Sequence, residues 1–190
     1  RLNSSAASDV YKRQILNQVI ETEYDVVVAG YGPVGETCAN LLGYYGIKAL
    51  ILDKEKNAYP LPRAITWDAE CQRAMSHCEF LSEVKTRKIR GVDNKDANKK
   101  SIMKITTEGF DTYNYQHRIL FIHQPQFDEA HRENAEKYST NTIKTGSELL
   151  AADEINGVVN CTYKNIDTNE QFTVTSKYLL ACDGANSTVR

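Results

Sequence analysis

Cysteine-pair motifs, long apolar runs and a strong charge of either sign are all missing from this sequence. The five cysteines are odd in number and form no CxxC motif, which argues against a disulfide framework or a zinc knuckle. The formal net charge of -2 leaves no basic surface of the kind that binds nucleic acid or anionic membranes. No apolar stretch approaches the roughly 20 residues needed to cross a bilayer. We therefore expect a soluble globular protein without a metal, nucleic-acid or membrane site.

The two ends of the chain carry expectations about its extent. The opening residues RLNSSAASDVYKRQ lack the apolar segment of a signal peptide, so a cytoplasmic location is expected. The chain begins with Arg1 rather than methionine, and Arg190 directly follows a motif described below. We expect a fragment of a longer protein, in which residues 1–22 form a disordered or non-native tail.

Residues 25–53, DVVVAGYGPVGETCANLLGYYGIKALILD, have the pattern of a strand, a glycine turn, a helix and a second strand. DVVVA is a continuous β-branched run, typical of a strand covered on both faces. Gly46 is expected to end the helix, and IKALIL predicts the second strand. The helix is predicted to bury one stripe of apolar residues, which comprises Val34, Cys38, Leu41, Leu42 and Tyr45. The whole segment predicts a βαβ unit with parallel strands.

Three glycines with the spacing GxGxxG form the turn. Gly30 would allow the tight turn, Gly32 would let the backbone approach a pyrophosphate, and Gly35 would let the helix pack on the sheet. The phosphates would then lie at the helix N-terminus, and Asp53 could accept hydrogen bonds from the ribose of an adenosine. The candidate cofactor-binding residues here are Gly30, Gly32, Pro33, Val34, Gly35, Asp53 and Lys54. A solvated turn also explains Lys54, and a glycine turn that binds nothing stays open as the alternative.

The chain beyond this unit does not continue with the βα repeats of an NAD dehydrogenase. Residues 56–64, KNAYPLPRA, form a loop marked by prolines. Residues 66–84 predict a helix, residues 85–100 a solvated, charged excursion, and residues 101–113 strand structure. This order disfavours a doubly wound NAD domain.

The last third of the chain predicts one helix and an antiparallel β-meander. HRILFIH, residues 117–123, is strand-like, and residues 124–138 predict a helix on whose apolar face His131 is a packed histidine rather than a catalyst. Residues 141–184 predict the meander, with a hairpin turn at Asn156-Gly157.

Three segments in order then resemble one protein family. VVVAGYGPVGETCANLLGYYGIKALILDKEKNAYPLPRAITWDAE, FIHQPQFDEAHRE and YLLACDGANSTVR are similar to the class A flavoprotein monooxygenases, the FAD-dependent aromatic hydroxylases. Within that family, GYGPVG, LPRA and the DAE stretch are most similar to the 3-(3-hydroxyphenyl)propionate hydroxylase branch. The resemblance implies FAD as cofactor and NAD(P)H as co-substrate, with a small phenolic substrate and O₂ as partners.

The resemblance also implies a fold and a domain organisation. Residues 23–190 would form an α/β, Rossmann-like FAD-binding domain with an antiparallel β-meander. Residues 86–122 would be an excursion towards a second, substrate-binding β-sheet domain. The full-length protein could form a homo-oligomer. No catalytic side chain can be named, because the family's aromatic pocket would lie beyond Arg190.

The family's roles carry over to four more residues. Arg63 would reach the phosphates, and Gln124 would bind the ribityl region of the flavin. Asp183 and Gly184 would contact the ribityl chain and the pyrophosphate. The chain departs from the family in having Asp53 where glutamate is usual and His131 where leucine is common. Two alternatives stay open: another FAD enzyme such as a halogenase or a reductase, and a non-catalytic nucleotide-binding fragment.

Overall fold

The computed structural model describes residues 19–20, 23–78, 84–107 and 118–190. Most of the predicted tail lies outside these residues. Its two described residues form β1 (Val19–Ile20), which pairs in parallel with Phe172 and Thr173. Residues 79–83 of the predicted helix 66–84 and residues 108–113 of the predicted strand 101–113 also lie outside the described residues. Among the described residues, no helix has the length and apolarity to cross a membrane.

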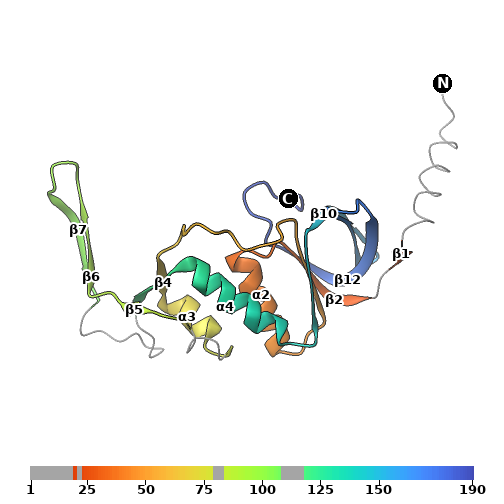
Figure 1. The fold of residues 1–190 in the computed structure, drawn as a ribbon, viewed down its shortest axis with the longest axis horizontal. Coiled ribbons are helices and arrows are strands. Elements are labelled where there is room, and N and C mark those ends of the chain that lie inside the picture. The colour runs from red at the N-terminus through yellow and green to blue at the C-terminus, as the bar shows by residue number, and fades with distance from the viewer. Residues whose placement is uncertain (1–18, 21–22, 79–83, 108–117) are drawn as a thin grey trace, which may run out of the picture.

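The predicted βαβ unit forms the centre of the main sheet (Figure 1). It consists of β2 (Tyr24–Ala29), α2 (Pro33–Tyr44) and β3 (Ala49–Asp53), and β2 and β3 are parallel. Both strands are buried from end to end except at single positions, because each face of the sheet carries its own core. Val27 packs on one face and Val28 on the other. The β-branched run therefore has the two-sided burial that it predicts.

One long strand joins the predicted meander to the parallel sheet. The first half of β12 (Gln171–Ala181) pairs antiparallel with β11 (Val158–Asn165), and its second half pairs in parallel with β2. β11 pairs in turn with β10 (Ser147–Ile155) across a turn in which Asn156 has φ 54° and Gly157 has φ 79°. Two positive φ values in a two-residue hairpin are the mark of a type I′ turn, which confirms the predicted hairpin.

The meander is shorter than predicted at its start. β9 (Asn141–Thr145) pairs in parallel with β3 at the edge of the main sheet and does not belong to the meander. Gly146, with φ 67°, separates β9 from β10. A left-handed residue breaks the extended run at that point, so the segment 141–155 forms two strands with different partners.

Of the predicted buried stripe of α2, Cys38, Leu41 and Leu42 are half-buried and pack against core residues, but the other two positions are wrong. Val34 and Tyr45 are each 64% exposed, whereas the buried residues are Gly35, Glu36, Ala39, Asn40 and Gly43. The reason is the neighbouring helix α4 (Gln124–Glu136), which lies beside α2 in Figure 1. A Cβ on Gly43 would overlap the ring of Tyr138, which follows α4. The two helices therefore approach through small residues, and the larger apolar side chains lie on the flanks.

The predicted helix 66–84 begins later and ends earlier than expected, since residues 76–78 form a turn. Thr66–Asp68 is a strand, β4, and the helix α3 covers Ala69–Met75. Asp68 caps the helix, because its carboxylate accepts a hydrogen bond of 2.8 Å from the backbone N–H of Cys71. β4 pairs with β8 (Ile119–Phe121), which also pairs with β5 (Arg87–Lys88). Because β4 pairs with β8, which is distant in sequence, these three residues form a strand and not the start of the helix.

The charged excursion contains strands that the sequence analysis did not predict. Besides β5, it holds β6 (Gly91–Lys95), which forms a hairpin with β7 (Ser101–Thr106). Every residue of β7 is exposed, and the hairpin stands away from the main sheet at the left of Figure 1. The solvent exposure agrees with the prediction, and the regular pairing is new.

Candidate functional site

The candidate site lies where three parallel strands end at the same edge of the sheet. The backbone N–H of Gly30 donates to Leu52 O at 2.7 Å, and that of Cys182 donates to Ala29 O at 2.7 Å. These bonds hold the residue that follows β2 between the ends of β3 and β12. The carboxyl edge of parallel strands is where ligands bind in open α/β sheets.

Two of the three motif glycines are required by packing. Gly30 has φ 96°, and a Cβ there would lie 2.6 Å from the carbonyl carbon of Cys182 and 2.9 Å from the Cα of Asp183. A Cβ on Gly35 would overlap the carbonyl oxygen of Gly30, so this glycine lets α2 start directly against the turn. The structure thus joins the glycine turn to the Asp183-Gly184 segment.

Gly32 is different, because a Cβ there would have no atom within 4 Å. Its φ of -85° and ψ of -172° suit any residue. Gly32 is also the N-cap of α2 and supplies no side-chain cap, and Pro33 has no N–H. The first helical bond runs from Glu36 N to Gly32 O at 2.8 Å, which leaves the N–H groups of Val34 and Gly35 without an intrahelical acceptor. An open glycine before free helix N–H groups fits the pyrophosphate of FAD.

Asp53 contacts the glycine turn through the backbone. Its Oδ2 accepts a hydrogen bond of 2.6 Å from the N–H of Tyr31, and its Oδ1 accepts one of 2.7 Å from the N–H of Glu55. A carboxylate oxygen has a second lone pair, so a ribose hydroxyl could still donate to either oxygen. Asp53 therefore supports the turn from the end of β3, whatever it does for a ligand. Lys54 beside it is exposed.

Asp183 organises the turn that follows β12. Its Oδ2 accepts hydrogen bonds from the N–H groups of Thr188 at 2.7 Å and Val189 at 3.3 Å. Burial acts to raise the pKa of Asp183, but these bonds and one from Ser187 outweigh it and lower the pKa below its ordinary value. Gly184 next to it has φ 77°. The carboxylate is thus held ionised beside the glycine turn.

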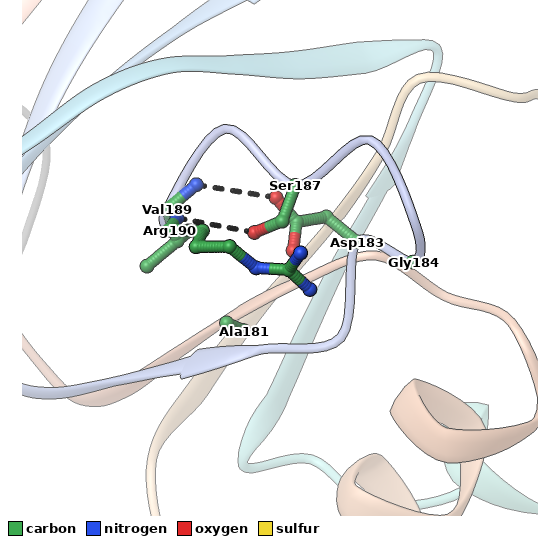
Figure 2. Close-up of a pocket in the computed structure, with 6 residues that line it drawn as sticks. All are labelled: Ala181, Asp183, Gly184, Ser187, Val189 and Arg190. Carbon is green, nitrogen blue, oxygen red and sulfur yellow. Dashed lines mark hydrogen bonds between the residues drawn. The ribbon is translucent and has the colours of Figure 1, made fainter.

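This turn borders an open cavity of about 330 Å³ (Figure 2). Its lining comes from the end of β12 and the following turn alone: Ala181, Asp183, Gly184, Ser187, Val189 and Arg190. None of the motif glycines lines it. We therefore place the candidate phosphate site at the glycine turn, where free N–H groups gather, and not in this cavity.

Arg63 and Gln124 lie together, and in the described part of the chain neither side chain forms a hydrogen bond or an ion pair with the glycine turn. Gln124 Oε1 accepts hydrogen bonds of 2.7 Å from the backbone N–H groups of both Arg63 and Ala64, and its Nε2 donates to Asp128 at 3.3 Å. The guanidinium of Arg63 lies 3.9 Å from the ring centroid of Tyr59. Gln124 thus fixes the LPRA loop to α4, and the predicted contacts of both residues with FAD stay predictions.

The sequence analysis missed a buried polar cluster behind the glycine turn. Arg132 of α4 donates from Nε to Glu36 Oε1 at 2.8 Å and from Nη2 to the carbonyl oxygen of Tyr31. Tyr31 and Glu36 are 1% and 0% exposed. A signal was present: Gly35, Ala39 and Gly43 recur every four residues, which marks a helix face in close contact with a neighbour. Glu36 follows the first of these small residues.

Burial shifts two titratable groups in this cluster towards their neutral forms. It raises the pKa of Glu36 to about 8, although the hydrogen bond from Arg132 opposes the shift. It lowers the pKa of His131 to about 3. His131 Nδ1 lies 3.7 Å from Glu36 Oε2, and its ring packs on Phe127 with centroids 4.3 Å apart. These contacts agree with the prediction of a packed histidine.

His131 should make the fold sensitive to acid. Between pH 6.5 and about 3, the unfolded chain carries a proton on this histidine that the folded chain does not. The contribution of neutral His131 to the free energy of unfolding is thus fully present above pH 6.5 and is lost as the pH falls towards 3. We expect His131→Leu to flatten the decline in unfolding free energy by up to about 1.4 kcal/mol per pH unit. Urea unfolding at about pH 7, 6 and 5 measures this. His77→Leu, at an exposed histidine, is the control, and an equal slope in both variants contradicts the assignment.

Comparison with known families matches residues 23–190 to the family described as FAD binding domain. A 3-(3-hydroxy-phenyl)propionate/3-hydroxycinnamic acid hydroxylase from Comamonas testosteroni is 30% identical over 92% of this chain and 29% of its own length. The hydroxylase of the same name from Klebsiella pneumoniae is 29% identical over 92% of this chain and 31% of its own length. The chain thus spans about 30% of the length of these relatives.

Solved structures share the fold. The p-nitrophenol 4-monooxygenase PnpA from Pseudomonas putida superposes with a TM-score of 0.79 at 23% identity, over 89% of this chain and 43% of that one. The flavin-dependent monooxygenase PieE, solved with FAD and substrate, superposes with a TM-score of 0.71 at 16% identity, over 89% of this chain and 31% of that one. These likenesses confirm the predicted fold class. The family match and the hydroxylase relatives confirm the resemblance to class A flavoprotein monooxygenases. With its glycine turn, its open Gly32 and a family match over residues 23–190, the chain belongs to the FAD binding domain family.

Proposed function

We propose that this chain is the FAD-binding part of a NAD(P)H-dependent monooxygenase that hydroxylates a phenolic ring. The observation that carries the proposal is the contrast among the motif glycines. At Gly30 and Gly35, neighbouring backbone atoms occupy the space that a Cβ would need. At Gly32, at the start of a helix, that space is open. A turn that served packing alone would not need a glycine at position 32, because its backbone angles suit any residue.

The candidate residues at this edge of the sheet divide into three groups in this proposal. The pyrophosphate would lie against Gly32, Pro33 and the N–H groups of Val34 and Gly35. Asp53 would accept from the adenosine ribose, and Asp183 and Gly184 would approach the ribityl chain. FAD, reduced by NAD(P)H, supplies the activation of O₂ and the transfer of one oxygen atom to the ring. The chain's own contribution is to bind and orient the cofactor.

The names of the relatives support a substrate class for this proposal. Two of them are named for 3-(3-hydroxyphenyl)propionate and 3-hydroxycinnamic acid, and both are 29–30% identical to this chain. We propose a substrate of this class, a phenol with a carboxylate side chain, and a role in aromatic compound catabolism. The domain boundaries, the cytoplasmic location and a homo-oligomer of the full-length protein stay predictions.

The chain should bind FAD but should not hydroxylate a phenol by itself. Its residues supply nucleotide contacts, and it spans only 29–31% of the relatives' length. Without a closed pocket around the reacting ring, any NAD(P)H oxidation should be uncoupled from product. The test is calorimetric titration with FAD, followed by addition of NADH or NADPH with 3-(3-hydroxyphenyl)propionate and a search for the catechol. Failure to bind FAD overturns the proposal. Catechol formed in step with coenzyme oxidation shows that the active site lies within these residues.

A further inference from the structure

Arg132 reaches the glycine turn from a different helix. Its side chain is 14% exposed, and its Nη2 donates to the carbonyl oxygen of Tyr31, the residue between the first two motif glycines. The guanidinium carbon also lies 4.6 Å from the centroid of the Tyr31 ring. The opposite side of the same residue is held by Asp53, which accepts from the Tyr31 N–H at 2.6 Å. Tyr31 is thus fixed at both its N–H and its carbonyl group.

The fixed carbonyl determines the direction of the next N–H. The Tyr31–Gly32 peptide is trans, since the described residues contain no cis peptide bond. In a planar trans peptide, the C=O and the following N–H point in opposite directions. Because Arg132 holds the Tyr31 carbonyl towards α4, the Gly32 N–H must point away from α4. Gly32 is also the residue whose Cβ position is open.

The guanidinium of Arg132 is hydrogen-bonded within the cluster. Its Nε lies 2.8 Å from Glu36 Oε1, and the Glu36 side chain is 1% exposed. A guanidinium is a planar donor that can hold two acceptors in fixed directions, here Glu36 Oε1 and the Tyr31 carbonyl oxygen. Arg132 can thus hold the Tyr31 carbonyl oxygen and the Glu36 carboxyl group in fixed positions relative to each other.

We propose that Arg132 is a positioning residue for the FAD pyrophosphate: it sets the Tyr31–Gly32 peptide so that the Gly32 N–H faces the phosphates. This role rests on the FAD site proposed above. Arg132 acts through the backbone and does not itself touch the cofactor. A lysine at this position would keep the charge but would lose the two-pronged geometry.

The test compares Arg132→Lys and Arg132→Ala with the unsubstituted protein. Both variants should weaken FAD binding about tenfold or more in calorimetric titration, the loss for a hydrogen bond to a charged group. In ¹⁵N-labelled protein, FAD should shift the Gly32 amide resonance, and this shift should shrink in Arg132→Lys. Ethylguanidinium added to Arg132→Ala should restore part of the affinity. Arg73→Lys, at an exposed arginine paired with Glu70, is the matched control and should bind FAD normally.

The outcomes separate this inference from the proposed function. If the unsubstituted protein fails to bind FAD, the proposed function is wrong and the inference falls with it. If it binds FAD and the folded variants bind equally well, only the role of Arg132 is wrong. Circular dichroism reports the folding of each variant. If neither variant folds, Arg132 supports the whole domain and not the turn, which also overturns the inference.

Discussion

Replacement of Gly32 by valine should abolish FAD binding while the protein still folds. The Gly32 backbone angles are open to any residue, and a Cβ there meets no protein atom within 4 Å. The valine side chain would instead occupy the space where the pyrophosphate approaches the backbone. We expect a loss of at least about a hundredfold in affinity, or ~2.7 kcal/mol. Titration with FAD measures the loss, and thermal unfolding of the apoprotein tests the fold.

The matched control is Gly35→Ala, three residues along the same motif. Its Cβ would overlap the carbonyl oxygen of Gly30, so this smaller change should lower the unfolding temperature. Together, Gly32→Val and Gly35→Ala separate a glycine that leaves room for a ligand from one that leaves room for the packing of the protein. Unchanged FAD affinity in folded Gly32→Val would show that the open surface is not the phosphate site. A Gly32→Val protein that does not fold would show that the turn has a packing role here too.

The βαβ unit could be predicted because its signals are local. A β-branched run, glycines at fixed spacing and a second apolar run follow one another in sequence order, and the structure confirms them. The buried face of α2 could not be read from apolar residues alone. Val34 is apolar but exposed, whereas Glu36 is polar but buried, since Arg132, 96 residues away in sequence, donates a hydrogen bond to it. A partner on a distant helix leaves no periodicity in the sequence.

The same limit explains the strands at the sheet edge. Residues 141–155 are one extended run by composition, and only the pairing of β9 with β3 and the left-handed Gly146 divide it. At the candidate site, the sequence correctly placed Gly30 against Gly35 and at the end of the strand beside the one that Asp53 ends. It could not show that the Gln124 amide is engaged with the LPRA backbone, because that contact spans about 60 residues of chain.

Asp53→Ala should weaken FAD binding about tenfold to a hundredfold, the equivalent of 1.5–3 kcal/mol for a hydrogen bond to a charged group. Two effects contribute. The Tyr31 N–H would lose its acceptor, which loosens the glycine turn, and the adenosine ribose would lose a carboxylate. Titration of the apoprotein with FAD measures the sum. Glu55→Ala is the control, because the Glu55 backbone N–H that donates to Asp53 remains and only an exposed side chain is removed.

A ligand without ribose hydroxyls separates the two effects of Asp53. The unsubstituted protein should prefer ADP to 2′,3′-dideoxy-ADP, because the free lone pairs of Asp53 would accept from the hydroxyls. In Asp53→Ala this preference should disappear, while the affinity for both ligands falls through the loosened turn. A preference that survives the substitution would assign Asp53 to the turn alone. Of the two carboxylates, it is that of Asp53 that accepts from the Tyr31 N–H, at 2.6 Å. Equal losses of FAD affinity in Asp53→Ala and Glu55→Ala would therefore show that Asp53 does not belong to the FAD site.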